Sequence, residues 1–455
     1  MDPSPSSSLE AWNSAAALAA TYLAGSADRR IAPAPPDLAR LQALHSAFPA
    51  HPTPVQDIIQ DLHAIAGPAT VNNAAGRYFG FVNGRALPAA LAASCFVNAW
   101  DQNAALNVMS PAGAFFDELA VAWVVEALGL PNESAGAIVT GATSANFTAV
   151  CAARHALLAR AKWDVEAQGL FGAPPLRVVV GAEVHVSLLK ALMLAGFGRE
   201  RVERVPVDAQ GRMLAGALPP LDANTIVCIQ AGNVNTGAFD PAAEICARAR
   251  QAGAWVHVDG AFGLWAAASP RYAPLTHGLA KADSWATDAH KWPNAGYDCG
   301  IAIVRHGAAL RAAMGTSAAY LPHSGQREPA HHGPEMSRRA RGVELWAVLR
   351  SLGRSGLAEL IDRTCAHAHR FAEGLRQAGF SILNDVVINQ VLVSFGEPER
   401  TRAVIQRIQD EGVCWCGGTE WQGRTAMRIS VSSWATTTAD VDRSLDSIRR
   451  AAASL

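Results

Sequence analysis

Asp259 and Lys291 are the two residues whose types, neighbours and spacing carry the most specific chemistry in the sequence. Asp259 ends the run Trp255–Val258 and is followed by a glycine and Ala261. Lys291 lies among His, Trp, Ala and Pro residues, which are poor surroundings for a solvated charge. An amine withdrawn from water can form an imine with an aldehyde, and a carboxylate can keep a heteroaromatic ring nitrogen protonated. The pair therefore predicts a pyridine aldehyde cofactor, pyridoxal phosphate, and a substrate with an amino group.

Either residue taken alone has a more ordinary explanation. A lone lysine is usually a solvated surface charge, and an aspartate at a strand end can be a helix N-cap or a turn residue. The small residues after Asp259 favour a functional role, because they leave room for a flat ring against the backbone. Ligands of open α/β sheets also bind beyond the carboxyl ends of the strands.

The turn Thr140–Asn146 follows another predicted strand and opens a predicted helix. Free N–H groups at a helix N-terminus bind anions, and Thr143 and Ser144 add hydroxyl donors. A simple Ser/Thr cap is the alternative explanation. The turn matches neither a P-loop nor the GxGxxG pattern, so one phosphate of a small cofactor fits it better than a dinucleotide.

Three further polar residues follow predicted strands. His185 comes after Arg177–Val180 and could stack on a ring, although a lone histidine is more often structural. Asn233 and Asn235 come after Thr225–Ile229 and could either donate hydrogen bonds to a cofactor or fix a turn.

Four arginines are candidate carboxylate or phosphate ligands, because the guanidinium group binds such anions with two parallel hydrogen bonds. A surface ion pair is the commoner role of an arginine near a helix or strand end. The four candidates are Arg338, Arg339, Arg341 and Arg428.

The composition excludes several classes of function. The chain has 455 residues, half of them hydrophobic, and a formal net charge of −1. This charge gives no electrostatic reason to expect binding to nucleic acid or to an anionic membrane. Of eight cysteines only Cys414 and Cys416 are close together, so we expect reduced cysteines in a cytoplasmic protein. No spacing of His, Asp and Cys residues predicts a metal site.

The sequence predicts neither a secretory nor a membrane-spanning segment. The N-terminus lacks a basic stretch leading into an apolar one, as a signal peptide would have. The apolar run Ala86–Trp100 is interrupted by Pro88 and Asn98 and is shorter than the about 20 residues that span a bilayer. We therefore expect a soluble protein.

The order of elements predicts an α/β fold. Short apolar runs without polar alternation are typical of strands buried on both faces of a mostly parallel sheet. Five such runs alternate with helical patterns: Ala137–Thr140, Arg177–Val180, Thr225–Ile229, Trp255–Val258 and Gly300–Arg305. We expect an N-terminal helical segment over residues 1–64, a large cofactor-binding domain over 65–342, and a small C-terminal α+β domain over 343–455.

These strand-end segments, in this order, resemble the group II pyridoxal-phosphate-dependent decarboxylases, which include aromatic-L-amino-acid, histidine and glutamate decarboxylases. The resemblance runs from about Arg77 to Leu360. It implies the aspartate-aminotransferase type of fold (PLP-dependent transferase fold type I), an amino acid as substrate, and a homodimer with active sites at the subunit interface.

The resemblance also implies roles for the residues that match the family's motifs. Lys291 would bond to the cofactor aldehyde, Asp259 would pair with the ring nitrogen, and His185 would stack on the ring and act in catalysis. The small side chain of Ala261 would lie against the ring. Four other residues are implied as cofactor contacts: Thr143, Ser144, Asn233 and His290.

Three departures from the family concern the pockets. Asn233 stands where the aromatic-acid enzymes carry a threonine, and Asp288 stands where they have a neutral asparagine near the phosphate. The pocket segment that reads Tyr-Phe-Pro-Thr in those enzymes begins with Phe81 here and has Asn83 at its third position. Phe81 and Asn83 are therefore candidate substrate contacts, and an aromatic substrate is not implied.

The largest departure lies in residues 321–341. Family decarboxylases have a tyrosine there, supplied by the partner subunit, which returns a proton to the substrate carbon. This stretch has no tyrosine; it has His323, His331 and His332, with Tyr320 just before it. A histidine could act as the acid, because imidazole titrates near neutral pH. His331 and His332 are therefore candidate residues of the substrate site.

The leading hypothesis is decarboxylation of an L-amino acid to its amine through a Lys291 Schiff base and a quinonoid intermediate. Without the loop tyrosine, that intermediate could instead be oxidised and deaminated to an aldehyde, or the enzyme could be a carbon–carbon lyase. A non-catalytic homologue is a third hypothesis. Retention of the lysine, the aspartate and His185 argues against it.

Overall fold

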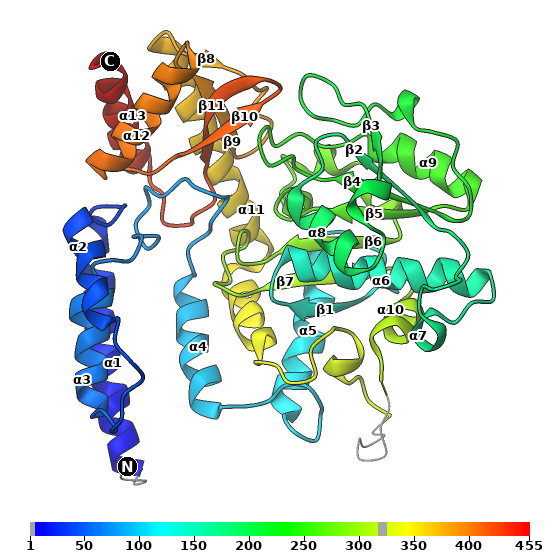
Figure 1. Cartoon of the computed structure of the whole chain (residues 1–455), viewed down its shortest axis with the longest axis horizontal. Helices are drawn as coiled ribbons and strands as arrows, with labels where there is room; N and C mark the ends of the chain where they lie inside the picture. The colour runs from blue at the N-terminus through cyan, green and yellow to red at the C-terminus, as the bar shows by residue number, and fades with distance from the viewer. Residues whose placement is uncertain (1–4, 317–324) are drawn as a thin grey trace.

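The protein is described by a computed structural model that covers residues 5–316 and 325–455. Tyr320 and His323, two of the candidate loop residues, lie outside these ranges. Figure 1 shows a column of N-terminal helices on one side, a small C-terminal domain above it, and a large domain on the other side. None of the described helices is both long and apolar enough to cross a membrane.

A seven-stranded sheet in the order β1-β7-β6-β5-β4-β2-β3 forms the centre of the large domain. Strand β7 runs antiparallel to its neighbours β1 and β6, and the other neighbouring pairs are parallel. The strands are β1 Ala135–Val139, β2 Arg177–Gly181, β3 Glu203–Val205, β4 Thr225–Gln230, β5 Trp255–Asp259, β6 Ser284–Asp288 and β7 Gly300–Val304. All five predicted strands are present, but β3 and β6 were not among those predicted.

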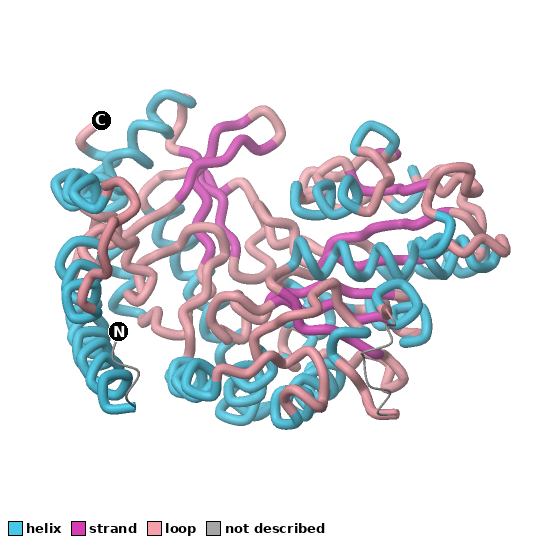
Figure 2. Tube along the Cα trace, turned by 60° about the horizontal axis from the view of Figure 1, so that its bottom comes forward, coloured by secondary structure: helices cyan, strands magenta, loops and turns pink. Residues whose placement is uncertain are grey.

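Helices cover both faces of this sheet, as Figure 2 shows. In β4 and β5, alternate side chains enter two different cores: Trp255 packs with one helix layer, and Val256 and Val258 pack with the other. Because both faces of the sheet are buried, the strands appear in the sequence as continuous apolar runs. The helices of the large domain are α5 Pro111–Ala127, α6 Ala142–Arg160, α7 Val165–Gln168, α8 Val186–Leu194, α9 Ala242–Ala252 and α10 Gly307–Met314.

The small C-terminal domain has an antiparallel sheet in the order β10-β11-β9-β8, as the predicted α+β unit requires. Its strands are β8 Ser381–Ile382, β9 Gln390–Ser394, β10 Gly417–Trp421 and β11 Arg424–Ser430, and its helices are α12 Pro398–Glu411 and α13 Thr438–Ala453. A capping box formed by Thr437 and Asp440 fixes the start of α13.

One long helix, α11 (Arg341–Gln377), connects the two domains. Gly353 interrupts its helical geometry with a φ of 58° and a ψ of −172°. Side chains from Leu345 to Cys365 join the core of the large domain, and those from Ala368 to Leu375 join the core of the small domain. The expected boundary after residue 342 stays a prediction, because the helix that follows it belongs to both cores.

Four α-helices of the described chain precede α5: α1 Pro5–Ala24, α2 Pro35–Arg40, α3 Val55–Asp61 and α4 Pro88–Trp100. Helices α1 and α3 pack together in a column beside α4 (Figure 1). The main chain ties this column to the small domain, because the Ile31 N–H donates to the Gly412 carbonyl oxygen at 2.8 Å.

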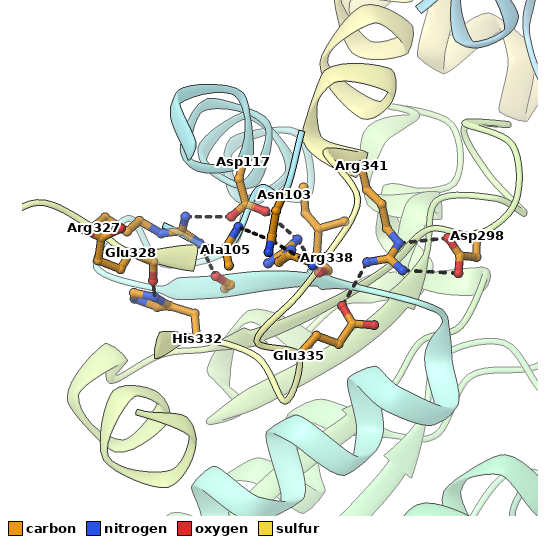
Figure 3. A network of polar contacts seen from close by, with 12 residues as sticks. Asn103, Ala105, Asp117, Asp298, Arg327, Glu328, His332, Glu335, Arg338 and Arg341 are labelled. Carbon is orange, nitrogen blue, oxygen red and sulfur yellow. Dashed lines mark hydrogen bonds and ion pairs between the residues drawn. The ribbon is translucent and has the colours of Figure 1, made fainter. Parts of the chain in front are cut away.

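The segment that follows residue 324 is held against β1 and α5 by the buried carboxylate of Asp117 (Figure 3). Asp117 pairs with Arg327 at 2.6 Å and with Arg338 at 2.8 Å, and its side chain is 2% exposed. The same two guanidinium groups donate to the carbonyl oxygens of Gly136 and Ile138 in β1. One carboxylate therefore fixes both ends of this segment.

Replacing Asp117 by alanine should lower the free energy of unfolding by about 3–5 kcal/mol, because it leaves two largely buried guanidinium groups without their anion. Urea unfolding of the purified protein measures this. Glu126→Ala on the same helix is the matched control: Glu126 pairs with Arg354 where both side chains are mostly exposed, and its loss should cost about 0.5 kcal/mol or less. Equal losses of unfolding free energy in the two variants would show that Asp117 does not hold this segment in place.

Candidate active site

Asp288, His290 and Lys291 form a compact charged cluster at the carboxyl end of β6. Lys291 Nζ lies 2.9 Å from Asp288 Oδ2, and His290 Nε2 lies 3.6 Å from the same oxygen. The Asp288 and Lys291 side chains are 3% and 16% exposed. The expected desolvation of Lys291 is therefore present, and Asp288 faces into the cluster rather than away from it.

The N-terminus of α6 meets this cluster. The Ala142 N–H, in the first turn of the helix, donates to Asp288 Oδ1 at 2.6 Å. In the turn that leads into this helix, the hydroxyls of Thr140 and Ser144 share a hydrogen bond of 2.8 Å. Thr143 is half-buried in the same turn. The free N–H groups and hydroxyls of this turn can bind an anion such as a phosphate.

Asp259 lies at the end of β5, next to β6. Its side chain is buried, and its Oδ1 has no hydrogen-bond partner in the described chain. Burial raises the pKa of this carboxyl, and the nearby His185 and Lys291 oppose that rise. A buried carboxylate oxygen without a partner is costly. A protonated ring nitrogen would satisfy it, so the residues present fit a pyridoxal ring.

A buried histidine, His257, supports this strand end and was not predicted from the sequence. Its Nε2 is 2.8 Å from the side-chain oxygen of Asn146 in α6, and its Nδ1 is 2.9 Å from Ser284 Oγ in β6. Burial lowers its pKa to about 3. His257 stands two positions before Asp259, so both side chains leave the same face of β5. The spacing of two residues between His257 and Asp259 was the sequence signal that could have indicated this shared face.

His185 caps the start of α8 with its side chain. Its Nδ1 accepts a hydrogen bond from the Ser187 N–H at 3.3 Å and lies 2.7 Å from the Ser187 hydroxyl. Burial lowers the pKa of His185, with a contribution from the charges of Lys291 and Arg428, whereas Asp259 raises it. The ring therefore lies within electrostatic reach of all three.

Arg428 brings a cation from the small domain to this region. It lies on β11, and its guanidinium donates to the Val234 carbonyl oxygen at 3.3 Å. Burial lowers its pKa. Its side chain has no carboxylate partner among the ion pairs of the described residues, whereas Arg338, Arg339 and Arg341 pair with Asp117, Glu344 and Asp298 respectively.

Two predicted pocket residues contact aromatic side chains. Asn83 accepts a hydrogen bond of 2.7 Å from the Tyr297 hydroxyl, and the Tyr297 ring stacks on His290 with centroids 4.3 Å apart. Phe81 is 61% exposed and stacks on Trp415. Tyr297 thus links Asn83 to the lysine cluster, and no pattern in the sequence indicated this link.

Asn233 builds a turn in this structure. Its side-chain oxygen accepts hydrogen bonds from the main-chain N–H groups of Asn235 and Thr236 at 2.9 and 3.2 Å. This is the turn-fixing alternative of the sequence analysis; its amide nitrogen has no partner in the described chain. Ala261 lies between the two aspartates, and its carbonyl oxygen accepts from the Asp288 N–H at 2.9 Å.

His331 and His332 lie apart from the lysine cluster. Both line a cavity of about 500 Å³ beside β1, together with Arg311 and Arg327. His332 Nδ1 is 3.0 Å from the Glu328 carbonyl oxygen, as Figure 3 shows, and burial lowers its pKa to about 4. No group of His, Cys, Asp and Glu residues in the described chain could hold a metal ion.

The fold and this site define a pyridoxal-phosphate enzyme, and comparison with known proteins identifies the family. The family model of the pyridoxal-dependent decarboxylase conserved domain matches residues 35–396, so the chain belongs to that family. It is a pyridoxal-phosphate-dependent carboxy-lyase of the amino-acid decarboxylases, as the resemblance implied.

One named relative agrees with this assignment, and two solved structures share the fold. Tryptophan decarboxylase 1 of Oryza sativa subsp. japonica is 27% identical over an alignment of 431 positions, which covers 86% of this chain and 83% of that protein. The crystal structure of Oryza sativa TDC with PLP and tryptamine has a TM-score of 0.90 at 22% identity and covers 100% of this chain and 99% of its own. That of Rhodiola rosea 4-hydroxyphenylacetaldehyde synthase has a TM-score of 0.85 at 20% identity and covers 100% of both chains. The predicted fold type I is confirmed.

The buried His257 should make the protein less stable in acid. Its folded-state pKa of about 3 lies below the ordinary value of 6.5, so only the unfolded chain takes up this proton between these two values. The contribution of His257 to the free energy of unfolding should therefore be fully present above pH 6.5. It should decrease by about 1.4 kcal/mol per pH unit as the pH falls toward 3.

Chemical denaturation at a series of pH values measures this slope. His257→Gln should remove the contribution of one proton, whereas His45→Gln, at an exposed site, should leave the slope unchanged. Identical slopes in wild type and His257→Gln would show that His257 does not titrate in this way.

Proposed function

We propose that this enzyme decarboxylates an L-amino acid to the corresponding amine. The observation that carries the proposal is that one sheet edge holds both the amine of Lys291 and the buried Asp259, one oxygen of which has no partner among the described residues. When bound, the cofactor supplies a ring that accepts the electrons of the broken bond between Cα and the carboxylate. The chain's own residues then have to hold the ring, orient the substrate and move protons.

Each residue of the cluster has a role in this proposal. Lys291 bonds to the cofactor aldehyde, and Asp259 keeps the proton on the ring nitrogen. The N-terminus of α6, with Thr143 and Ser144, binds the phosphate. His185 covers the ring face and acts on the substrate. Its position is supported by its electrostatic contact with Asp259 and Lys291.

Arg428 is our candidate for binding the carboxylate of the substrate. It is largely buried, has no acidic partner among the described residues, and lies within electrostatic reach of His185. A guanidinium in such a position can bind a carboxylate with two hydrogen bonds. Phe81 and Asn83 stay candidates for the pocket that binds the substrate side chain. The amino-acid panel described below identifies which substrate they select.

A second outcome, an aldehyde formed by decarboxylation and oxidative deamination, is favoured by one observation. Residues 321–341 contain no tyrosine that could return a proton to the substrate carbon. A carbon–carbon lyase is the remaining alternative. If a loop histidine supplies the proton, His331 is the better candidate, because the lowered pKa of His332 keeps its imidazole neutral at pH 7.

We also propose a homodimer whose interface includes the N-terminal helices. Large apolar side chains are exposed on α1, α3 and α4, and exposed apolar surface of this kind supports an interaction site. Examples are Leu9, Trp12, Val55, Ile58, Phe96 and Trp100. Sedimentation of the cofactor-loaded protein tests this, and a monomer mass would contradict it. Cytoplasmic location stays a prediction.

An assay of carbon dioxide, amine, aldehyde and peroxide over a panel of L-amino acids decides between the products. Amine without peroxide is expected. Aldehyde with peroxide would replace the leading proposal by the second one. Lys291→Ala should lose turnover of every substrate; a turnover that survives would exclude the proposed role of this lysine.

The same assay tests the loop histidines. General acids contribute about 10²–10⁴-fold to a rate, so His331→Asn should reduce amine formation by about a hundredfold or more. His332→Asn should have the smaller effect. Unchanged rates in both variants would remove these histidines as proton donors.

A further inference from the structure

The Asp288 carboxylate already contacts the N–H group that a phosphate would need and the amine that an aldehyde would need. Its Oδ1 accepts a hydrogen bond of 2.6 Å from the Ala142 N–H at the start of α6, and its Oδ2 lies 2.9 Å from the amine of Lys291. The side chain is 3% exposed. A single buried carboxylate thus satisfies a donor of the anion-binding helix terminus and also neutralises the amine.

The surroundings of Asp288 fix its main chain and leave its side chain as the part that can move. The Asp288 N–H donates to the Ala261 carbonyl oxygen at 2.9 Å, and the Trp265 indole donates to the Asp288 carbonyl oxygen at 3.2 Å. The turn before α6 is close as well, because a Cβ at Gly141 would lie 3.5 Å from Asp288 Oδ1. The carboxylate can leave the α6 terminus only by side-chain rotation.

A phosphate bound at the start of α6 would place a second anion beside this buried carboxylate. Two like charges a few ångströms apart repel strongly where water is excluded. The ion pair with Lys291 must also open before the amine can attack an aldehyde. Cofactor binding therefore has to break the contacts of the Asp288 carboxylate with Ala142 and Lys291.

We propose that Asp288 is an internal competitor of the cofactor's phosphate, which pairs with Lys291 and the α6 terminus until the cofactor displaces it. With the cofactor bound, the Ala142 N–H would be free to donate to the phosphate. The Lys291 amine would be free to form a C=N bond with the aldehyde, and water and the proton of the ammonium group would leave to solvent. Asp288 is a positioning residue, and this proposal rests on the proposed binding of the phosphate at α6.

The test is a four-way comparison of two ligands and two proteins, started from cofactor-free enzyme. The ligands are pyridoxal phosphate and pyridoxal, which lacks the phosphate. The proteins are wild type and Asp288→Asn, whose amide oxygen can still accept from Ala142. Dissociation constants come from titrations that follow the visible absorbance of the lysine-bound ligand. The ratio of the four constants isolates the interaction between Asp288 and the phosphate.

We expect Asp288→Asn to raise the preference for pyridoxal phosphate over pyridoxal by about tenfold, because one repelling anion is gone from the helix terminus. Inorganic phosphate should also raise the melting temperature of the cofactor-free variant more than that of wild type. If Asp288→Asn fails to fold, Asp288→Ser is the second variant and should change both measurements in the same direction.

Asp283→Asn is the matched control. Asp283 precedes β6 at its opposite end, is also largely buried, and accepts from the Val256 N–H at 2.8 Å. Its loss should leave the ligand preference unchanged. An unchanged or lowered preference for pyridoxal phosphate in Asp288→Asn would overturn the proposal. No amino acid enters these titrations, so their outcome is independent of which product the enzyme makes.

Discussion

Two buried carboxylates on neighbouring parallel strands are the constraint on which this site depends. Strands β5 and β6 end on Asp259 and Asp288, and a carboxylate that has left water is unfavourable unless a donor or a cation meets it. The chain itself supplies partners for Asp288, among them Lys291 and an N–H of α6. Among the described residues, one oxygen of Asp259 has no partner. The two carboxylates therefore differ: the chain satisfies Asp288, and Asp259 keeps an oxygen that a ligand could meet.

The strand-end segments could be predicted from the sequence because each is a local pattern. The turn before α6, Asp259 and Lys291 each stand next to an apolar run or among apolar residues, and the parallel sheet then brings them to one edge. Strand β6 was missed as an element because three of its five residues, Ser284, Thr287 and Asp288, are polar although all five are buried. Burial of polar residues cannot be read from periodicity.

The contacts that were not predicted join residues far apart in the chain. His257 reaches Asn146 from 111 positions away, and Arg428 reaches Val234 from 194 positions away. Arg338, Arg339 and Arg341 had looked like ligand candidates of the same kind as Arg428. Tertiary packing separates them: in the described part of the chain, the first three pair with carboxylates, whereas Arg428 donates to a carbonyl oxygen and has no carboxylate partner. Residue type alone cannot make that distinction.

The connection through α11 divides the enzyme into two parts that can change separately during evolution. The residues proposed to hold the cofactor belong to one edge of the large sheet, and substitutions there would disturb several of them at once. Arg428 lies on a strand of the small sheet, whose hydrophobic core is largely separate from that of the large domain. Mutations in the small domain could therefore shift the position of Arg428, the proposed carboxylate ligand, while the proposed cofactor site stays as it is. Related chains could then acquire new substrates without a new way of holding the same cofactor.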